Sequence, residues 1–270
     1  MKIKMEPWYY LIPGGVAVAI AAVLWKRRTG GGGGALPLVH TALGDIDLGP
    51  IDTSRAAIHK AARPIVEVAV QRVLGRPGTP AELQYVQAVS YLETNYGKGW
   101  NGAMVGSNNW GAVQCPGNAQ SGPDCIPYQD SQSSGAKYNV SFRRYATPED
   151  GATDVAKRIL KSQPLTASAL SSPEGTVSMA SYAMRREHYY GGFCPKALAQ
   201  FGAAAADASF AHPDRDEGTS ACAKEAVILH ITVAGKLVKA IAAAVGEEPM
   251  RIGNFDDADD WYKSTRGAVA

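Results

Sequence analysis

The sequence predicts a mainly α-helical fold with a small β component (α+β), preceded by a single membrane-spanning helix and a glycine-rich linker. An uncharged apolar run near the N-terminus predicts the membrane helix, and a glycine run soon after it predicts the linker. Several later segments combine helical spacing of apolar residues with helix-starting and helix-ending residues. We therefore expect an anchor at 1–28, a linker at 29–51, a folded domain at 52–246 and an acidic tail at 247–270.

The predicted anchor contains an uncharged run at residues 7–25. A helix rises about 1.5 Å per residue, so this run would span roughly the 30 Å hydrocarbon core of a bilayer. Aromatic residues lie near both ends of the run, and Lys26, Arg27 and Arg28 follow it, as is typical of membrane interfaces. A cleaved signal peptide would instead place a small-residue cleavage site there. We expect an uncleaved anchor that binds the lipid bilayer.

Charge and cysteines disagree about the side of the membrane on which the folded domain lies. The positive-inside rule weighs the three basic residues after the run against Lys2 and Lys4, and slightly favours the cytoplasm. The four cysteines favour an oxidising space, because Cys115 and Cys125 flank a Pro/Gly-rich loop typical of a disulfide; Cys194 and Cys222 would then pair. We expect an extracytoplasmic or periplasmic domain, or one in a virion membrane, with free buried thiols as the alternative.

Composition limits the partners of the folded domain. A hydrophobic share of 46% provides a core, and the net charge of +2 comes without a basic stripe beyond residues 26–28. This distribution argues against nucleic-acid binding. The histidines are scattered and no C-x2-C pair occurs, so we predict neither a zinc site nor a cofactor.

The folded domain is expected to consist of helices and one clear strand. Thr79, Pro80 and Glu82 form a capping box and first-turn proline at the start of a helix that Gly97 ends. Thr147 is the expected N-cap of a later helix. The expected helices lie at 52–75 with a kink at Pro64, 79–97, 147–160, 176–192 and 220–246, and the expected strand at 138–146.

Glu93 is the candidate catalytic residue. It continues a stripe of Leu83, Val86 and Val89 or Ser90 on the second helix, near the C-terminal end. Desolvation and the negative end of the helix dipole would both raise the pKa of its carboxyl. A carboxyl that stays protonated near neutral pH suits general acid catalysis. The alternative is a glutamate at a frayed helix end that points into water.

The segment "GSNNWGAVQC" after this helix supplies amides and an indole beside tight glycine turns. Amides can bind sugar hydroxyls, and an aromatic ring can stack on a pyranose face. A structural turn could also use Asn and Gly, but it would not require the tryptophan. We therefore favour a glycan-binding cleft.

The order "ETNYG", "NNWGA" and "FRRYATPEDG" resembles the lysozyme-like peptidoglycan hydrolases, closest to the flagellar and autolysin-type glucosaminidases. The resemblance covers about residues 79–192. It implies a lysozyme-like domain with a small β-hairpin lobe across the cleft and Glu93 as the catalytic acid. The partner would be the glycan strands of peptidoglycan, and a membrane-tethered cutter could also belong to an envelope or virion assembly. The expected substrate-binding residues are Tyr96, Asn108, Asn109, Trp110, Gln114, Phe142, Tyr145, Tyr189 and Tyr190.

The sequence offers more than one candidate for a second catalytic group. Glycosidases usually pair two carboxyl groups, at about 5–5.5 Å for retention or about 6.5–9.5 Å for inversion of configuration. Asp124 and Asp130 are the candidates, because Glu149 and Asp150 are better explained as first-turn helix residues. Lysozyme-like enzymes can also act with one glutamate, by substrate assistance or by forming an anhydro ring.

Four other functions compete with a glucosaminidase. A muramidase or a lytic transglycosylase would share the fold and Glu93, although the chain reads "NNWGAVQC" where transglycosylases usually carry G-L-M-Q. A cell-wall amidase or peptidase with Cys115 and His188 is disfavoured, because Pro116 and Gly117 follow the cysteine where a helix should begin, and because Cys125 is nearby. The remaining alternative is a membrane-tethered wall-binding or assembly protein without catalysis.

Overall fold

The computed structural model describes residues 48, 50–115, 124–131, 137–187, 189 and 221–267. The predicted anchor and nearly all of the predicted linker lie outside these residues. Among the described helices, none is both long and apolar enough to cross a membrane.

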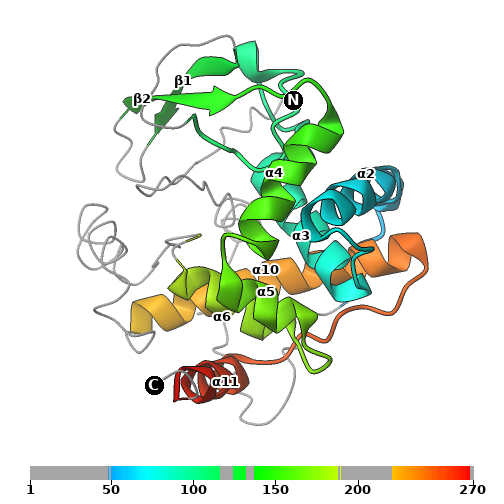
Figure 1. Ribbon diagram of the computed structural model, residues 1–270, viewed down its shortest axis with the longest axis vertical. Coiled ribbons are helices and arrows are strands. Elements are labelled where there is room, and N and C mark those ends of the chain that lie inside the picture. The colour runs from blue at the N-terminus through cyan, green and yellow to red at the C-terminus, as the bar shows by residue number, and fades with distance from the viewer. Residues whose placement is uncertain are drawn as a thin grey trace, which may run out of the picture.

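The described part is mainly helical with a two-stranded antiparallel sheet, as predicted. Figure 1 shows the sheet at one end of the molecule, α11 at the other end, and the remaining helices between them. The elements are α2 (Ala56–Leu74), α3 (Pro80–Thr94), the 3-10 turn η1 (Gly102–Met104), β1 (Cys125–Ser131), β2 (Lys137–Arg143), α4 (Pro148–Leu160), α5 (Pro164–Ser171), α6 (Val177–Arg186), α10 (Ala221–Val245) and α11 (Phe255–Gly267).

Helix α3 is the central helix of the larger hydrophobic core. It packs against α2, α4, α5 and α10, and most of its residues are buried. The buried residues therefore surround the helix axis and do not form the single stripe expected from its sequence. Glu93 is one of these buried residues.

The N-terminus of α3 confirms the predicted capping box. The Glu82 main-chain N–H donates to Thr79 Oγ1 at 3.2 Å, and the Thr79 N–H donates to Glu82 Oε2 at 2.7 Å. Arg76 also donates to the Glu82 carboxylate, at 2.7 and 3.0 Å. These contacts stabilise the charged form and hold the pKa of Glu82 below its usual range, although burial opposes them as the largest single effect.

The hairpin forms a lobe with a small core of its own. Strand β1 pairs with β2 so that Ile126 lies opposite Phe142. Phe142 and Ile126 pack with Trp100, Met104 and Ala112, separately from the larger core. The predicted strand is confirmed, and the chain passes from the helical core to the hairpin core between residues 96 and 112.

Helix α6 ends at Arg186, before the predicted end at Gly191 and Gly192, which lie outside the described residues. The next residue, Glu187, has a partner far away in the sequence. Its carboxylate accepts hydrogen bonds from the N–H groups of Leu165 at 2.7 Å and Thr166 at 2.9 Å, at the start of α5. A carboxylate at a helix N-terminus satisfies free N–H groups and is stabilised by the helix dipole.

The segment after residue 246, predicted to be a mobile acidic tail, is folded onto the domain. Met250, Ile252, Phe255, Ala258 and Tyr262 are buried in the larger core. The acids of α11 hide this pattern in the sequence, because they occupy the positions between the buried residues. The expected domain boundary at 246 is therefore not a boundary of the fold.

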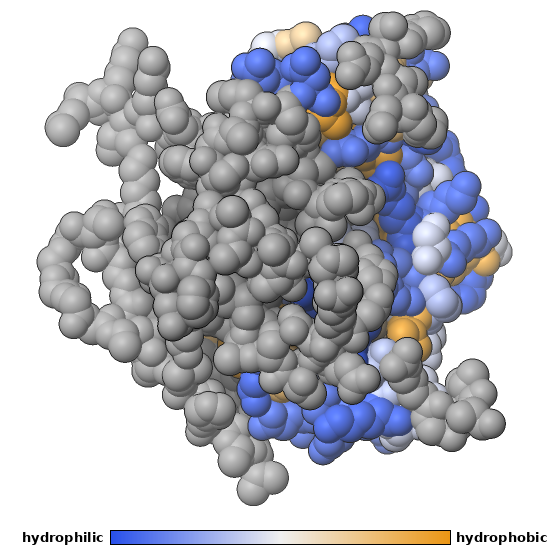
Figure 2. Space-filling view, turned by 90° about the vertical axis from the view of Figure 1, so that its left-hand side faces the viewer, coloured by the Kyte–Doolittle hydropathy of each residue, from blue (hydrophilic) through white to orange (hydrophobic). Residues whose placement is uncertain are grey.

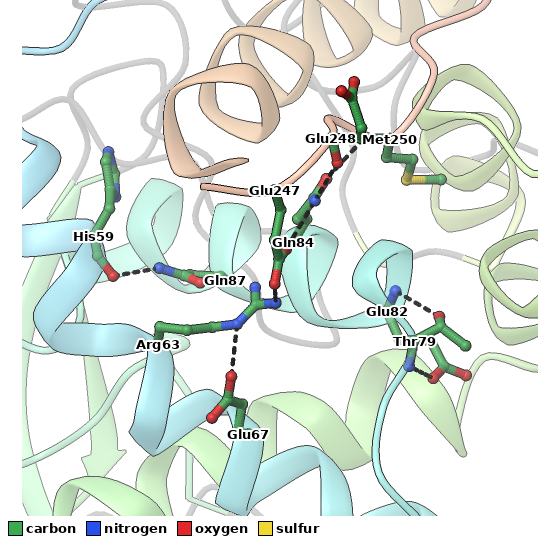
Figure 3. A network of polar contacts seen from close by, with 10 residues as sticks. All are labelled: His59, Arg63, Glu67, Thr79, Glu82, Gln84, Gln87, Glu247, Glu248 and Met250. Atoms are coloured by element: carbon green, nitrogen blue, oxygen red, sulfur yellow. Dashed lines mark hydrogen bonds and ion pairs between the residues drawn. The ribbon is translucent and has the colours of Figure 1, made fainter. Parts of the chain in front are cut away.

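A buried polar network attaches the start of this segment to α2 and α3 (Figure 3). Gln84 of α3 donates to Glu247 Oε2 at 3.1 Å and to the Glu248 carbonyl at 2.8 Å, and its Oε1 accepts from the Met250 N–H at 2.7 Å. Arg63 of α2 forms ion pairs with Glu67 and Glu247. Because the Gln84 amide is fully buried and has three partners, it fixes the position of residues 247–250 against α3.

Candidate active site

The side chain of Glu93 lies in the last turn of α3, and the residue is 6% exposed. Its Oε2 atom is buried without a hydrogen-bond partner among the described residues. Burial raises the pKa of the Glu93 carboxyl well above its usual range, and the positive charge of Arg158 on α4 opposes the rise. The structure thus places Glu93 in an environment that favours the protonated carboxyl.

Tyr189, three residues after the end of α6, interacts electrostatically with Glu93, and its contact with substrate stays a prediction. It is 4% exposed, and its hydroxyl has no hydrogen-bond partner within the described part of the chain. Burial, and then the charge of Glu93, raise the pKa of this hydroxyl far above its usual value. Tyr189 therefore keeps its proton and remains a hydrogen-bond donor close to Glu93. Its predicted companion Tyr190 lies outside the described residues.

The turn that follows Glu93 has an unusual backbone. Asn95, Tyr96 and Gly97 have φ angles of 50°, 57° and 76°, three left-handed residues in succession. A residue other than glycine in this region costs of the order of 1–3 kcal/mol, and such strain concentrates at functional sites. Trp110 packs on this turn, because a Cβ atom at Gly97 would lie 3.2 Å from its indole ring.

The tryptophan and the amides of the predicted cleft contact the protein itself. Trp110 is 3% exposed, and its ring centroid lies 5.3 Å from that of Tyr96. Asn109 is fully buried: its Nδ2 donates to the carbonyls of Val113 at 2.9 Å and Arg143 at 3.0 Å, and its Oδ1 accepts from the Val113 N–H at 2.9 Å. Trp110 therefore has a structural role in packing on this turn, and the side-chain amide of Asn109 forms its hydrogen bonds with main-chain groups.

Asn108 lies half-buried beside this pair in a left-handed conformation, with φ of 53°. Its Nδ2 donates to the carbonyls of Tyr145 at 3.1 Å and Ala146 at 3.3 Å. Gly151 of α4 packs directly on it, since a Cβ atom there would lie 1.8 Å from the Asn108 carbonyl oxygen. Asn108 and Asn109 thus hold the connection between α3, the hairpin and α4.

Three further predicted residues lie in the hairpin lobe or next to it. Phe142 is buried in the small core, and Gln114, half-buried, pairs with it through a β-bridge. Tyr145 is half-buried, and its hydroxyl donates to Asp154 Oδ2 at 2.5 Å. Contact of these residues and of Tyr96 with a glycan stays a prediction.

The aspartates predicted as the second carboxyl group differ in what the structure shows of them. Asp124 is exposed. The main chain of Asp130 lies in β1, opposite Tyr138, but its side chain is outside the described part. Neither is shown near Glu93, and both assignments stay predictions.

Asp154 on α4 is a carboxylate that the sequence reading missed. It accepts hydrogen bonds from Tyr145 at 2.5 Å and Arg143 at 3.3 Å, so it joins α4 to the end of the hairpin. It also interacts electrostatically with Tyr189, as Glu93 does. The only sequence signal was its place one turn after Asp150, in the helix that follows "FRRY".

The predicted disulfide between Cys115 and Cys125 is confirmed and closes the base of the hairpin lobe. Cys194 and the side chain of Cys222 lie outside the described residues, so their pairing stays a prediction. Among the described residues, no group of three or more His, Cys, Asp and Glu side chains could hold a metal ion.

The site contains a buried carboxyl with a raised pKa that interacts electrostatically with Arg158 and Tyr189, at the end of α3 where the chain leaves the larger core for the hairpin core. A carboxyl of this kind can donate a proton to a leaving oxygen. Figure 2 shows that the described residues on one face of the molecule are mainly hydrophilic, with small separate hydrophobic areas.

Comparisons with known proteins give little further information. No protein-family model matches the chain, and no curated protein matches it. The chain is similar to a solved structure described as a peptidoglycan hydrolase mutant from Sphingomonas sp. A1, with 20% identity and a TM-score of 0.38 over 71% of this chain and 98% of that one. A similarity this distant carries no argument, so the function must be argued from the residues.

Proposed function

We propose that the chain is a peptidoglycan hydrolase that cleaves β-1,4 glycosidic bonds of the glycan strand with Glu93 as general acid, in the manner of an N-acetylglucosaminidase. The observation that carries the proposal is the buried Glu93 carboxyl with its raised pKa, at the end of α3 where the chain leaves for the hairpin lobe. The order of the motifs "ETNYG", "NNWGA" and "FRRYATPEDG" supports peptidoglycan as the substrate. The anchor at 1–28 would hold the enzyme at a membrane, with the domain on the wall side, for local opening of the wall.

The reaction begins with proton transfer from Glu93 to the glycosidic oxygen, as the bond to the sugar breaks and positive charge develops at the anomeric carbon. A nearby carboxylate stabilises that charge or activates water. Asp154 is our candidate for this second role, because its Oδ2 accepts hydrogen bonds from both Tyr145 and Arg143, and because it interacts electrostatically with Tyr189, as Glu93 does. Asp124 and Asp130 remain the alternatives.

The test is release of reducing ends from purified peptidoglycan by the wild type and three variants. Glu93→Gln keeps the shape of the side chain but has no proton of suitable acidity, so activity should fall by at least about 10²-fold, the lower end of a general acid contribution. Asp154→Asn should also lose most of the activity. Glu82→Gln is the matched control, because Glu82 is a buried glutamate of the same helix that caps its first turn.

The control should lose stability but keep its turnover. Full activity of Glu93→Gln would contradict the proposal, and full activity of Asp154→Asn would contradict the assignment of the second carboxylate. No cleavage by the wild type on several wall types would favour a wall-binding or assembly protein. Mass spectrometry of the products separates reducing N-acetylglucosamine, reducing N-acetylmuramic acid and anhydro ends, and so distinguishes glucosaminidase, muramidase and transglycosylase.

A further inference from the structure

His59 on α2 is a buried polar residue that the proposed reaction does not use. It is 1% exposed, and its Nδ1 shares a hydrogen bond of 2.7 Å with the hydroxyl of Tyr96. The His59 ring also meets the edges of two tyrosine rings, at centroid distances of 4.9 Å to Tyr91 and 5.9 Å to Tyr96. Gln87 of α3 donates to the His59 carbonyl at 2.7 Å, as Figure 3 shows. His59 is therefore fixed from both its main chain and its ring.

The partner hydroxyl belongs to the left-handed turn that follows Glu93. Tyr96 lies three residues after Glu93 and has a φ angle of 57°. Its main-chain N–H donates to the Ser90 carbonyl at 3.3 Å, which closes the last turn of α3. Its ring packs on Trp110 at 5.3 Å. Tyr96 thus contacts three parts of the chain: α2, the last turn of α3 that carries Glu93, and the segment that leads to the hairpin lobe.

A left-handed conformation at a residue with a side chain persists only when its surroundings impose it. The main-chain hydrogen bond from Tyr96 to Ser90 accompanies this conformation, and the His59 bond and the Trp110 contact fix the direction of the Tyr96 side chain. Burial, and then the charge of Arg55, lower the pKa of His59 to about 4. The ring is therefore neutral at neutral pH, and the link is a neutral hydrogen bond.

We propose that His59 is a positioning residue, which acts through Tyr96 to hold the turn after α3 and thereby keeps the Glu93 carboxyl in its buried place. The effect on reaction rate rests on the proposed function, whereas the effect on Glu93 itself does not. The hydroxyl of Tyr96 is bound to His59 of α2, and the predicted contact of Tyr96 with a glycan stays a prediction.

The experiment measures two quantities in the full chain: the titration of Glu93, by NMR with carbon-labelled glutamate and assigned with Glu93→Gln, and kcat and KM on soluble peptidoglycan fragments. Tyr96→Phe removes only the hydroxyl, and His59→Leu removes the ring nitrogen. His59→Asn keeps a polar atom near the position of Nδ1. The matched control is Tyr182→Phe, which removes the buried hydroxyl that donates to Asp259 at 2.6 Å between α6 and α11.

We expect Tyr96→Phe and His59→Leu to let water reach Glu93, so that its pKa falls toward the ordinary value. Arg158 and Tyr189, the charged and titratable neighbours of Glu93, are unchanged in both variants. The kcat should fall about 10- to 100-fold, as expected for a displaced catalytic group, with little change in KM. His59→Asn should recover part of both quantities, and Tyr182→Phe should change neither.

An unmoved Glu93 titration in a folded Tyr96→Phe variant would overturn the proposal, as would an equal change in Tyr182→Phe. If His59→Leu does not fold, Tyr96→Phe decides, since it removes a single oxygen. A wild type that cleaves no glycan would contradict the proposed function only, because the titration still tests the positioning of Glu93.

Discussion

At the scale of single residues, the raised pKa of Glu93 links the proposed acid catalysis to the stability of the fold. The native state holds a proton on Glu93 that the unfolded chain releases above a pH of about 4.3, the ordinary pKa of glutamate. Between that pH and the native pKa of Glu93, the unfolded state binds fewer protons than the native state. The contribution of Glu93 to the free energy of unfolding therefore decreases as pH rises through this interval.

We predict that Glu93→Gln becomes more stable than the wild type as pH rises. The glutamine has no proton to lose, so the difference in unfolding free energy should be small near pH 4. It should then grow by up to about 1.4 kcal/mol per pH unit toward the native pKa of Glu93. Urea unfolding at several pH values measures the difference, and the contribution of His59 cancels because both proteins contain it. A difference that does not change with pH would show that Glu93 titrates normally.

The burial of Glu93 at a helix end was predictable from the sequence, but the contacts of the residues around it were not. Glu93 lies at a helix end within an apolar run, and both features are local. Asn109 and Trp110 have the chemistry of a glycan site, yet they are buried against Val113 and Tyr96. Residue type does not reveal whether an amide faces a ligand or a main-chain carbonyl, because that depends on segments far away in the sequence.

At the scale of elements, the connection between α3 and the hairpin depends on the Asn109 side chain. Its amide binds main-chain groups of Val113, which precedes β1, and of Arg143, the last residue of β2. A single side chain therefore holds the two ends of the lobe together. Each buried main-chain group left without a partner costs about 1–3 kcal/mol.

We predict that Asn109→Ala lowers the free energy of unfolding by about 2–4 kcal/mol, because it leaves several buried main-chain groups without partners. Asn108→Gly is the matched control. Asn108 is only half-buried, and glycine adopts its φ angle of 53° without strain. The control should lose less than about 1 kcal/mol. Thermal or urea unfolding of both variants checks this, and equal losses would contradict the role given to Asn109.

Helix starts were more predictable than helix ends. The caps at Thr79 and Thr147 are formed by residues three positions apart, so the sequence contains both partners in one short window. The end of α6 depends on Glu187, whose carboxylate binds the start of α5 more than twenty residues earlier. A contact between residues so far apart in the sequence cannot be predicted from the helical spacing of apolar residues.

At the scale of the whole molecule, the segment 247–267 completes the core. Phe255 and Tyr262 pack on Tyr182 of α6, at ring centroid distances of 5.4 and 5.3 Å. The main chain at Arg251 and Ile252 accepts hydrogen bonds from the N–H groups of Val177 and Ser178, at 2.9 and 2.8 Å. The segment therefore caps α6 and covers one side of the core at the same time.

We predict that a chain ending at residue 246 does not fold cooperatively. Truncation exposes the core on α6 and α10, and leaves Gln84 and Arg63 buried without their partners at 247–250. Circular dichroism during thermal unfolding, with amide exchange, measures the loss. A chain ending at residue 267 is the control and should unfold like the full chain. A sharp transition in the shorter chain would show that 247–267 is dispensable.

The same segment sets when this protein can fold during its synthesis. Residues 247–267 emerge from the ribosome after all other described parts, yet they bury Met250 and Phe255 in the central core. Until they emerge, the N–H groups of Val177 and Ser178 at the start of α6 lack their acceptors, and the nascent chain has no complete core. We therefore expect the domain, and the Glu93 site within it, to reach the folded state only after this segment is synthesised.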